Sequence, residues 1–259
     1  MSEKIRFGGM ALSNGVLVHG PTSWACAIRT DEGEIKVAGA PKPFLAPRIR
    51  QPFLRGPLRL VESFAVIPEV RRRLPEARLP FERPTVLAAT VASATAVQVL
   101  RRSTKVGDAA RELLSGALSL APAVFALRGG ELAAYHGAEH VSIGTYEHGE
   151  KRAKEHERCG SHLIGPILAA SAVGNVLASR APAHLRGPAR AASTLAAVGT
   201  AVEVFAWMTK HPKHPLAKAL ARPGHELQNR LATEEPTSAQ LEVAEAALEA
   251  CLELETRGD

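Results

Sequence analysis

The chain has 259 residues, of which 46% are hydrophobic and only 4% aromatic, so it is not a disordered chain and can form one large domain or two small ones. The net charge is +6, but the Lys and Arg residues lie mostly between apolar stretches and are not interleaved with aromatic residues, so we expect no nucleic-acid partner. Three cysteines far apart in the sequence, Cys26, Cys159 and Cys251, argue against a disulfide framework.

Residues 1–47 have the pattern of a small β element. Short apolar runs occur at 16–18, 24–29 and 34–37. Gly33 lies between the last two runs and can supply the positive φ that a tight turn requires. We therefore expect a hairpin near the start of the chain.

Residues 48–83 are expected to form a linker and an interfacial helix. The proline-rich stretch 41–57 does not suit regular structure. Residues 54–66 have the pattern of an amphipathic or interfacial helix. Several arginines in 71–83 form a basic approach to the first long apolar segment.

Residues 84–209 contain four stretches with almost no charged residue. A helix needs about 20 residues to span a bilayer, with about 17 as the lower end, so the third and fourth stretches are long enough, the first is marginal and the second is short. The alternative is a soluble bundle of Ala-rich buried helices. We expect a mostly α-helical bundle of about four helices, embedded in the lipid bilayer. The stretches are 84–100, 113–127, 159–179 and 191–209, the last interrupted only by Glu203.

The distribution of Lys and Arg between the expected loops favours one orientation. The loops on the same side as residues 1–83 carry more of these residues than the opposite loops, which predicts that both termini are cytoplasmic. Residues 210–259 are then a C-terminal cytoplasmic helical tail. Its helix is expected to begin at Ser238, because Leu241, Ala244 and Leu248 follow at helical spacing.

A His-x-x-Glu-His motif at residues 136–140 is the best candidate for chemistry. On a helix, His136 and His140 lie on one face, with roughly 5–6 Å between their Cβ atoms, so they can bind one divalent metal. Imidazole ligands suit zinc better than magnesium or calcium. Glu139 points about 100° around the helix from His140, which favours a general base over a ligand. Gly137 weakens the helix but lets a ligand or a neighbouring helix approach closely.

A third metal ligand is expected, because a catalytic zinc usually has three protein ligands and an open position. Five of the ten histidines fall between 136 and 162, together with Glu and Cys, which is the composition of a ligand-bearing segment. Glu203 is the first choice, because it is the sole acid in an apolar segment. Glu147 and Cys159 are the reserves, and His156 is a further candidate. The alternative is a polar helix face that binds no metal.

The same residues carry a resemblance to a known family. Tyr135-His136-Gly137-Ala138-Glu139-His140, followed by Tyr146-Glu147 and by the run from His156 to Ser161, resembles the YqhQ family of bacterial membrane proteins, whose function is unknown and which is often described as metal-dependent. Further agreement lies in residues 8–25, 52–63 and 227–244. The chain departs from the family pattern at three positions, since it has Asn14, Val141 and Glu157 where the family usually has Glu, Lys and Pro.

The resemblance implies a multi-pass protein of the bacterial cytoplasmic membrane with cytoplasmic flanks. Two functions follow as expectations. The first is a zinc-dependent enzyme, a hydrolase, with Glu139 as its base. The second is a non-enzymatic membrane scaffold or assembly protein with a structural metal or none. The substrate is not specified by either, and a homo-oligomer is compatible with both.

Overall fold

An antiparallel four-stranded sheet forms the N-terminal part of the chain. The computed structural model describes residues 4–42, 44–103, 105–127 and 130–257. Gly33 has a φ of +89° in the turn between the last two strands, so the expected hairpin and the role of its glycine are confirmed. The strands lie in chain order and are β1 (Gly8–Leu12), β2 (Gly15–His19), β3 (Ser23–Arg29) and β4 (Ile35–Pro41).

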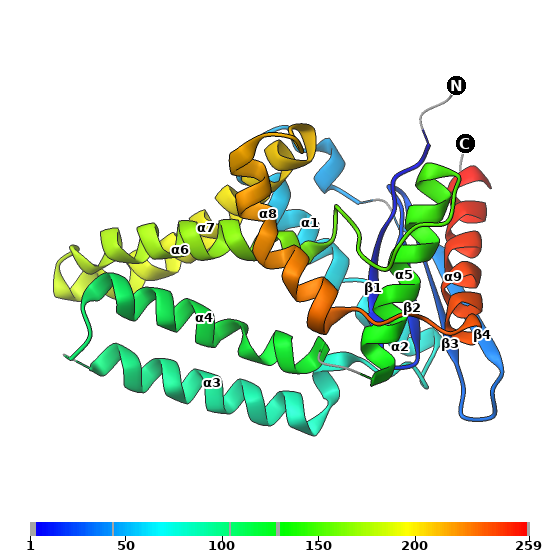
Figure 1. Ribbon diagram of the computed structural model, residues 1–259, viewed down its shortest axis with the longest axis horizontal. Coiled ribbons are helices and arrows are strands. Elements are labelled where there is room, and N and C mark those ends of the chain that lie inside the picture. Colours follow the sequence, from blue (N-terminus) through cyan, green and yellow to red (C-terminus); the bar gives the residue numbers. More distant parts are fainter. Residues whose placement is uncertain (1–3, 43, 104, 128–129, 258–259) are drawn as a thin grey trace.

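Two helices that are about 100 residues apart in the sequence cover one face of the sheet. Helix α5 (Gly130–His148) packs against β1, and α9 (Ser238–Arg257) packs across β2, β3 and β4 and against α5 (Figure 1). Val16, Val18 and Ala25 point into the core between the sheet and these helices. A predicted C-terminal helix is therefore present, and it is part of the main hydrophobic core.

The opposite face of the sheet is covered by the chain that follows β4. Alternate strand residues such as Leu17 and Trp24 point to this side, as the period of two in a strand requires. They pack against helix α2 (Ile67–Arg73) and the residues around it, and Trp24 is fully buried. We call β1–β4, α2, α5 and α9 the sheet region.

A buried carboxylate fastens α9 to the sheet. Glu255 accepts hydrogen bonds from the backbone N–H groups of Thr22 and Ser23 at 2.8 and 2.7 Å. It also accepts from the hydroxyls of both residues at 2.8 and 2.6 Å. Because the four donors satisfy this buried acid, it fixes the end of α9 beside the turn between β2 and β3.

The linker is more ordered than its proline content suggested. Helix α1 (Arg55–Phe64) begins inside the stretch that was expected to lack regular structure, and a 3₁₀ turn, η1 (Ala46–Arg48), precedes it. Pro57 lies in the first turn of α1, where a proline costs no hydrogen bond. Regular structure was not expected in residues 41–57, and this expectation was wrong at η1 and at the start of α1. The amphipathic helix expected over 54–66 is confirmed.

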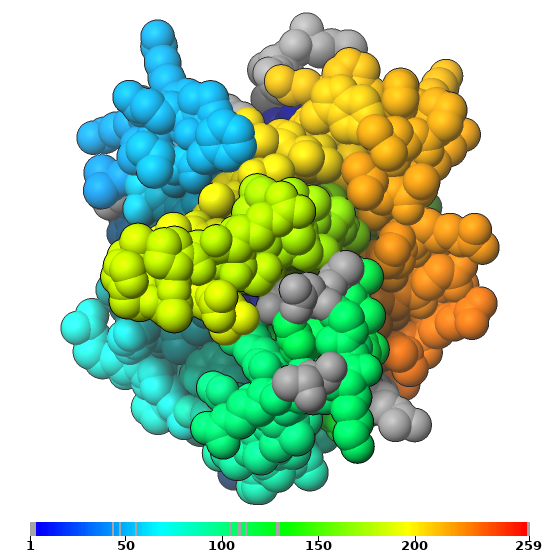
Figure 2. Space-filling model, turned by 90° about the vertical axis from the view of Figure 1, so that its left-hand side faces the viewer, coloured from blue at the N-terminus to red at the C-terminus, as the bar shows by residue number. Residues whose placement is uncertain are grey.

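Four helices extend away from the sheet region as an arm made of two hairpins (Figure 1). Each apolar stretch found in the sequence forms one of these helices. The arm ends at the two hairpin connections, which face the viewer in Figure 2. The first and last described residues both lie at the other end, beside the sheet (Figure 1). The helices are α3 (Pro84–Arg102), α4 (Asp108–Leu127), α6 (Ile164–Ser179) and α7 (Arg186–Lys210).

Two segments of the arm are long and apolar enough to cross a membrane, Gly160–Ser179 and Ala183–Lys210. A third span would need α4 and α5 together, but these two are bent by 89° to each other and α5 packs on the sheet. Large apolar side chains of the arm are exposed, among them Val91 at 68% and Leu195 at 69%. The arm is therefore compatible with a lipid environment, and the sheet region has a core of its own.

The arm returns to the sheet region through α8 (Pro215–Leu227) and a π-helical turn, η5 (Gln228–Ala232). An extended stretch then leads to α9, and on its way the backbone N–H of Glu234 donates to the carbonyl of Ala133 in α5. Gly137 allows this approach, since a Cβ there would overlap the carbonyl oxygen of Glu234. A close approach does occur at Gly137, but it is made by an extended segment and not by the ligand or helix that was expected.

Candidate metal centre

The motif histidines lie on the buried middle part of α5. Their ring centroids are 4.3 Å apart, as the spacing of four residues on a helix predicts. His136 is 9% exposed and His140 is 3% exposed. Burial of a protonated imidazole is costly, and it lowers the pKa of His140, so this ring favours the neutral form that ligates metals.

In each histidine, a backbone carbonyl binds one ring nitrogen and leaves the second nitrogen free. The Nδ1 of His136 donates to the carbonyl of Ala232 at 2.8 Å, and the Nδ1 of His140 donates to the carbonyl of Lys154 at 2.6 Å. A carbonyl can only accept, so each Nδ1 carries the hydrogen, and in a neutral ring the free lone pair is then on Nε2. Metal-binding histidines are usually oriented in this way.

Cys159 meets the two free nitrogens. Its Sγ lies 3.5 Å from Nε2 of His136, and one ligand atom from each of the three residues lies within 4.8 Å of the others. In a tetrahedral zinc site, with Zn–N about 2.0 Å and Zn–S about 2.3 Å, the nitrogen and sulfur lie about 3.5 Å apart. Cys159 and His136 thus have the separation of two ligands that share one ion, and His140 lies close enough to join them.

Glu139 lies beside this group without belonging to it. It is 6% exposed, and burial raises the pKa of its carboxyl group, although the nearby His136 and His156 partly oppose this. The side chain packs against β1, because a Cβ on Gly9 would meet its Oε1 at 2.5 Å. Among the described residues its carboxylate has no hydrogen-bond partner, which is unusual for a buried acid.

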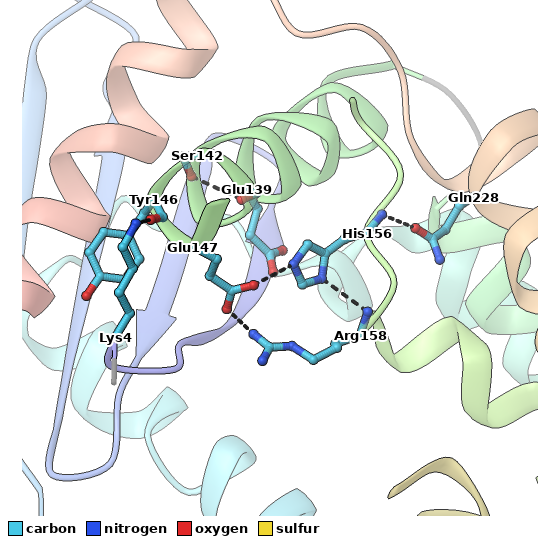
Figure 3. A network of polar contacts seen from close by, with 8 residues as sticks. All are labelled: Lys4, Glu139, Ser142, Tyr146, Glu147, His156, Arg158 and Gln228. Atoms are coloured by element: carbon cyan, nitrogen blue, oxygen red, sulfur yellow. Dashed lines mark hydrogen bonds and ion pairs between the residues drawn. The ribbon is translucent and has the colours of Figure 1, made fainter. Parts of the chain in front are cut away.

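Glu147 binds two residues that do not belong to this group of three side chains. It accepts a hydrogen bond from Nε2 of His156 at 3.3 Å and forms an ion pair with Arg158 (Figure 3). Burial would raise the pKa of Glu147, but the hydrogen bond from His156 and the charge of Arg158 outweigh it, so the pKa is lowered. Figure 3 shows this network next to Glu139, with the carboxylates of both acids on the same side of the His156 ring in this view.

Glu203 lies on α7, in the arm, and is not one of the three residues whose ligand atoms converge. The sequence thus suggested four candidates for the third ligand, and the structure brings Cys159 to the two histidines. The segment 149–159, which carries Cys159, has little regular structure, so helical spacing could not have indicated its place.

Other residues at the centre had no recognisable signal in the sequence. Ala232 and Lys154 act through their backbone carbonyls, which any residue could supply. Gln228 is fully buried beside the loop that carries Cys159, and its only hint was its place in a stretch that resembles the family.

The three departures from the family pattern lie in different settings. Asn14 is buried in the turn before β2, where its amide donates to the carbonyls of Arg29 and Glu76 and accepts from the N–H of Arg78. Val141 is buried on α5, next to His140, and Glu157 is exposed in the loop before Cys159. Asn14 therefore has a structural role in this chain.

Comparison with known proteins finds matches in the half of the chain that holds the centre. Residues 131–254 match the model of a family described as a protein of unknown function (DUF1385). The uncharacterized protein YqhQ of Bacillus subtilis (strain 168) is 33% identical over 129 residues, which are 47% of this chain and 40% of that protein. No solved structure matches. The matches support a relationship to the YqhQ family, and the chain spans less than half the length of that relative.

Proposed function

We propose that the protein is a metal-dependent membrane enzyme, a hydrolase, whose zinc site consists of His136, His140 and Cys159. The observation that carries this proposal is the arrangement of the two imidazoles. Both place Nδ1–H on a backbone carbonyl, and both direct Nε2 toward the group that contains the Cys159 sulfur. A surface cluster of histidines has no need of this shared orientation.

The residues present fit zinc better than other common ions. Two imidazole nitrogens and a thiolate are ligands that zinc prefers, whereas magnesium and calcium prefer oxygen. Three protein ligands leave a fourth position open, which is the pattern of a catalytic site. The buried carboxylate of Glu139 lies beside His136, one of the three candidate ligands.

Glu139 is suited to accept and return a proton. A zinc ion held at this site would supply Lewis-acid chemistry and lower the pKa of water. Burial raises the pKa of Glu139, which brings its proton affinity closer to that needed near neutral pH. The close packing of Gly9 against its side chain holds the carboxylate in place and limits access of bulk water.

Metal analysis of the purified protein tests the ligand set. We expect the wild type to contain a stoichiometric amount of zinc, and we expect Cys159→Ser to lose it. Glu203→Gln is the matched control and should retain the metal. The proposal fails if the wild type binds no divalent metal, and the ligand set is wrong if Glu203→Gln loses zinc while Cys159→Ser keeps it.

A structural metal in a non-enzymatic scaffold is the second candidate, because the three residues of the motif are each at most 9% exposed. Cobalt substitution separates the two functions. An open position should let a small hydroxamate change the visible spectrum of the cobalt protein, and Glu139→Gln should keep its metal. A spectrum that does not respond would favour the structural role.

The proposal includes insertion of all four arm helices in the bacterial cytoplasmic membrane, with both termini in the cytoplasm. It is supported by the two apolar spans, by the exposed apolar side chains of the other two helices, and by the placement of both chain ends beside the sheet. A helix rises about 1.5 Å per residue, so 19 or 20 residues, the lengths of α3 and α4, cover about the 30 Å of a hydrocarbon core.

A further inference from the structure

The π-helical turn η5 contacts two of the segments that carry the candidate ligands. The carbonyl of Ala232, at its end, accepts the Nδ1 hydrogen of His136. Gln228, at its start, is 0% exposed and lies against the segment around Cys159. π-helical turns are rare and occur often at functional sites. This turn is thus placed to influence the geometry of the centre.

The side-chain amide of Gln228 binds the chain on both sides of Cys159. Its Oε1 accepts a hydrogen bond from the backbone N–H of His156 at 2.9 Å. Its Nε2 donates to Oγ of Ser161 at 2.7 Å and faces Nδ1 of His162 at 3.3 Å. The amide thereby joins the residue three positions before Cys159 to the residues two and three positions after it.

Gln228 is itself held in place. The backbone N–H and the hydroxyl of Thr233 both donate to the backbone carbonyl oxygen of Gln228, at 3.2 and 2.9 Å. The ammonium group of Lys154 donates to the carbonyl of Thr233, and the carbonyl of Lys154 accepts from His140. The same few residues therefore connect the supports of all three candidate ligands.

Cys159 needs such support more than the histidines do. His136 and His140 are on one helix, which sets their separation, whereas Cys159 follows a segment with little regular structure. We propose that Gln228 is a positioning residue that holds the loop 156–161 so that the Cys159 sulfur meets the two free imidazole nitrogens. This inference rests on the proposed metal site for its function, although the loop geometry can be measured without metal.

The first test is the zinc affinity of Gln228→Met, which keeps the length of the side chain and removes its hydrogen bonds. Loss of an outer support of a metal ligand typically costs 10–100-fold in metal affinity, and we expect a loss in that range. Gln240→Met is the matched control, because Gln240 is also buried and, among the described residues, its side chain bonds to Glu131 and Thr237. Equal affinities of the two variants would overturn the inference.

A double-mutant cycle shows whether Gln228 acts through the cysteine. In a Cys159→Ser background, Gln228→Met should lower zinc affinity by less than threefold, because the group that it positions is already lost. A full additional loss would mean that Gln228 supports the fold in general. Gln228→Glu, which keeps the acceptor for His156, is a second variant to use if the methionine variant does not fold.

Alkylation of Cys159 by iodoacetamide, after removal of metal with a chelator, separates this inference from the proposed function. We expect Gln228→Met to change the rate several-fold, and Gln240→Met to leave it unaltered. A changed rate in a protein that binds no zinc would reject the metal site and keep the positioning role. An unchanged rate with unchanged zinc affinity would reject the positioning role alone.

Discussion

The sheet region and the arm use similar apolar residues in opposite ways. In the sheet region, side chains from both faces of the sheet are buried, and Trp24 and Val16 are 0% exposed. In the arm, large apolar side chains such as Val91, Val173 and Leu195 are more than 60% exposed. The comparison teaches that composition alone does not identify a core. The sheet region can form its core in water. The outer surface of the arm instead needs an apolar environment, and we propose that this environment is lipid.

The largest effect is expected from removing the central side chain of the sheet region. Trp24→Ala should lower the free energy of unfolding by about 3–5 kcal/mol, because a large buried aromatic leaves a cavity. Leu195→Ala, on the outer surface of α7, should change it by about 0.5 kcal/mol or less. Denaturant unfolding in mild detergent, followed by circular dichroism, measures both. Similar losses for both variants would mean that the arm has a packed core on that side.

A charge on the outside of the arm tests its surroundings. Leu195→Lys should disfavour insertion by about 2.5–3.5 kcal/mol if the side chain faces the bilayer centre, and by far less nearer the interface. The same change at exposed Val37 in β4 should have little effect, because this strand belongs to the sheet region. The fraction of protein in carbonate-washed membranes reports the difference. Full recovery of the wild type in a detergent-free soluble fraction would contradict a membrane arm.

Removal of a motif histidine should affect the sheet region and leave the arm unaltered. His140→Ala should lower zinc affinity at least about 100-fold, since one of three ligands is lost, and the arm helices should keep their circular dichroism signal. Glu139→Gln should keep the metal, because its carboxylate is not part of the converging group. Elemental analysis after dialysis gives the metal content. Release of zinc from Glu139→Gln would make Glu139 a ligand.

The smallest perturbation is chemical labelling of thiols. Burial raises the pKa of Cys26 to about 12, and it raises the pKa of Cys251 to about 11 despite hydrogen bonds that partly oppose it. At pH 8 the fraction in the reactive thiolate form is then about 10⁻⁴ for Cys26 and about 10⁻³ for Cys251. We expect iodoacetamide to modify partly exposed Cys159 first, and zinc to protect it. Mass spectrometry of peptides identifies the site, and prior labelling of Cys251 would contradict the packing of α9.

The success of the sequence-based predictions depended on how local each signal was. The turn at Gly33, the apolar stretches and the pairing of His136 with His140 all depend on residues close together in the chain, and the structure contains them. The third ligand depended on contacts across the loop that leads to Cys159, so spacing could not select it over Glu203. The placement of α9 in the main core was also not predictable, because its partners are strands more than 200 residues earlier in the chain.

The fastening of Glu255 to Thr22 and Ser23 has a consequence for the order of biosynthesis. A ribosome adds about 5–20 residues per second, and the N-terminal part of the chain leaves the ribosome first. The strands therefore emerge well before α9 exists. The part of the sheet that α9 covers must then stay open until the arm has been made, and α5, with its two histidines, gains its neighbour α9 only at the end. We expect that zinc loading is a late step in maturation, and that nascent chains stalled before residue 238 do not retain the metal.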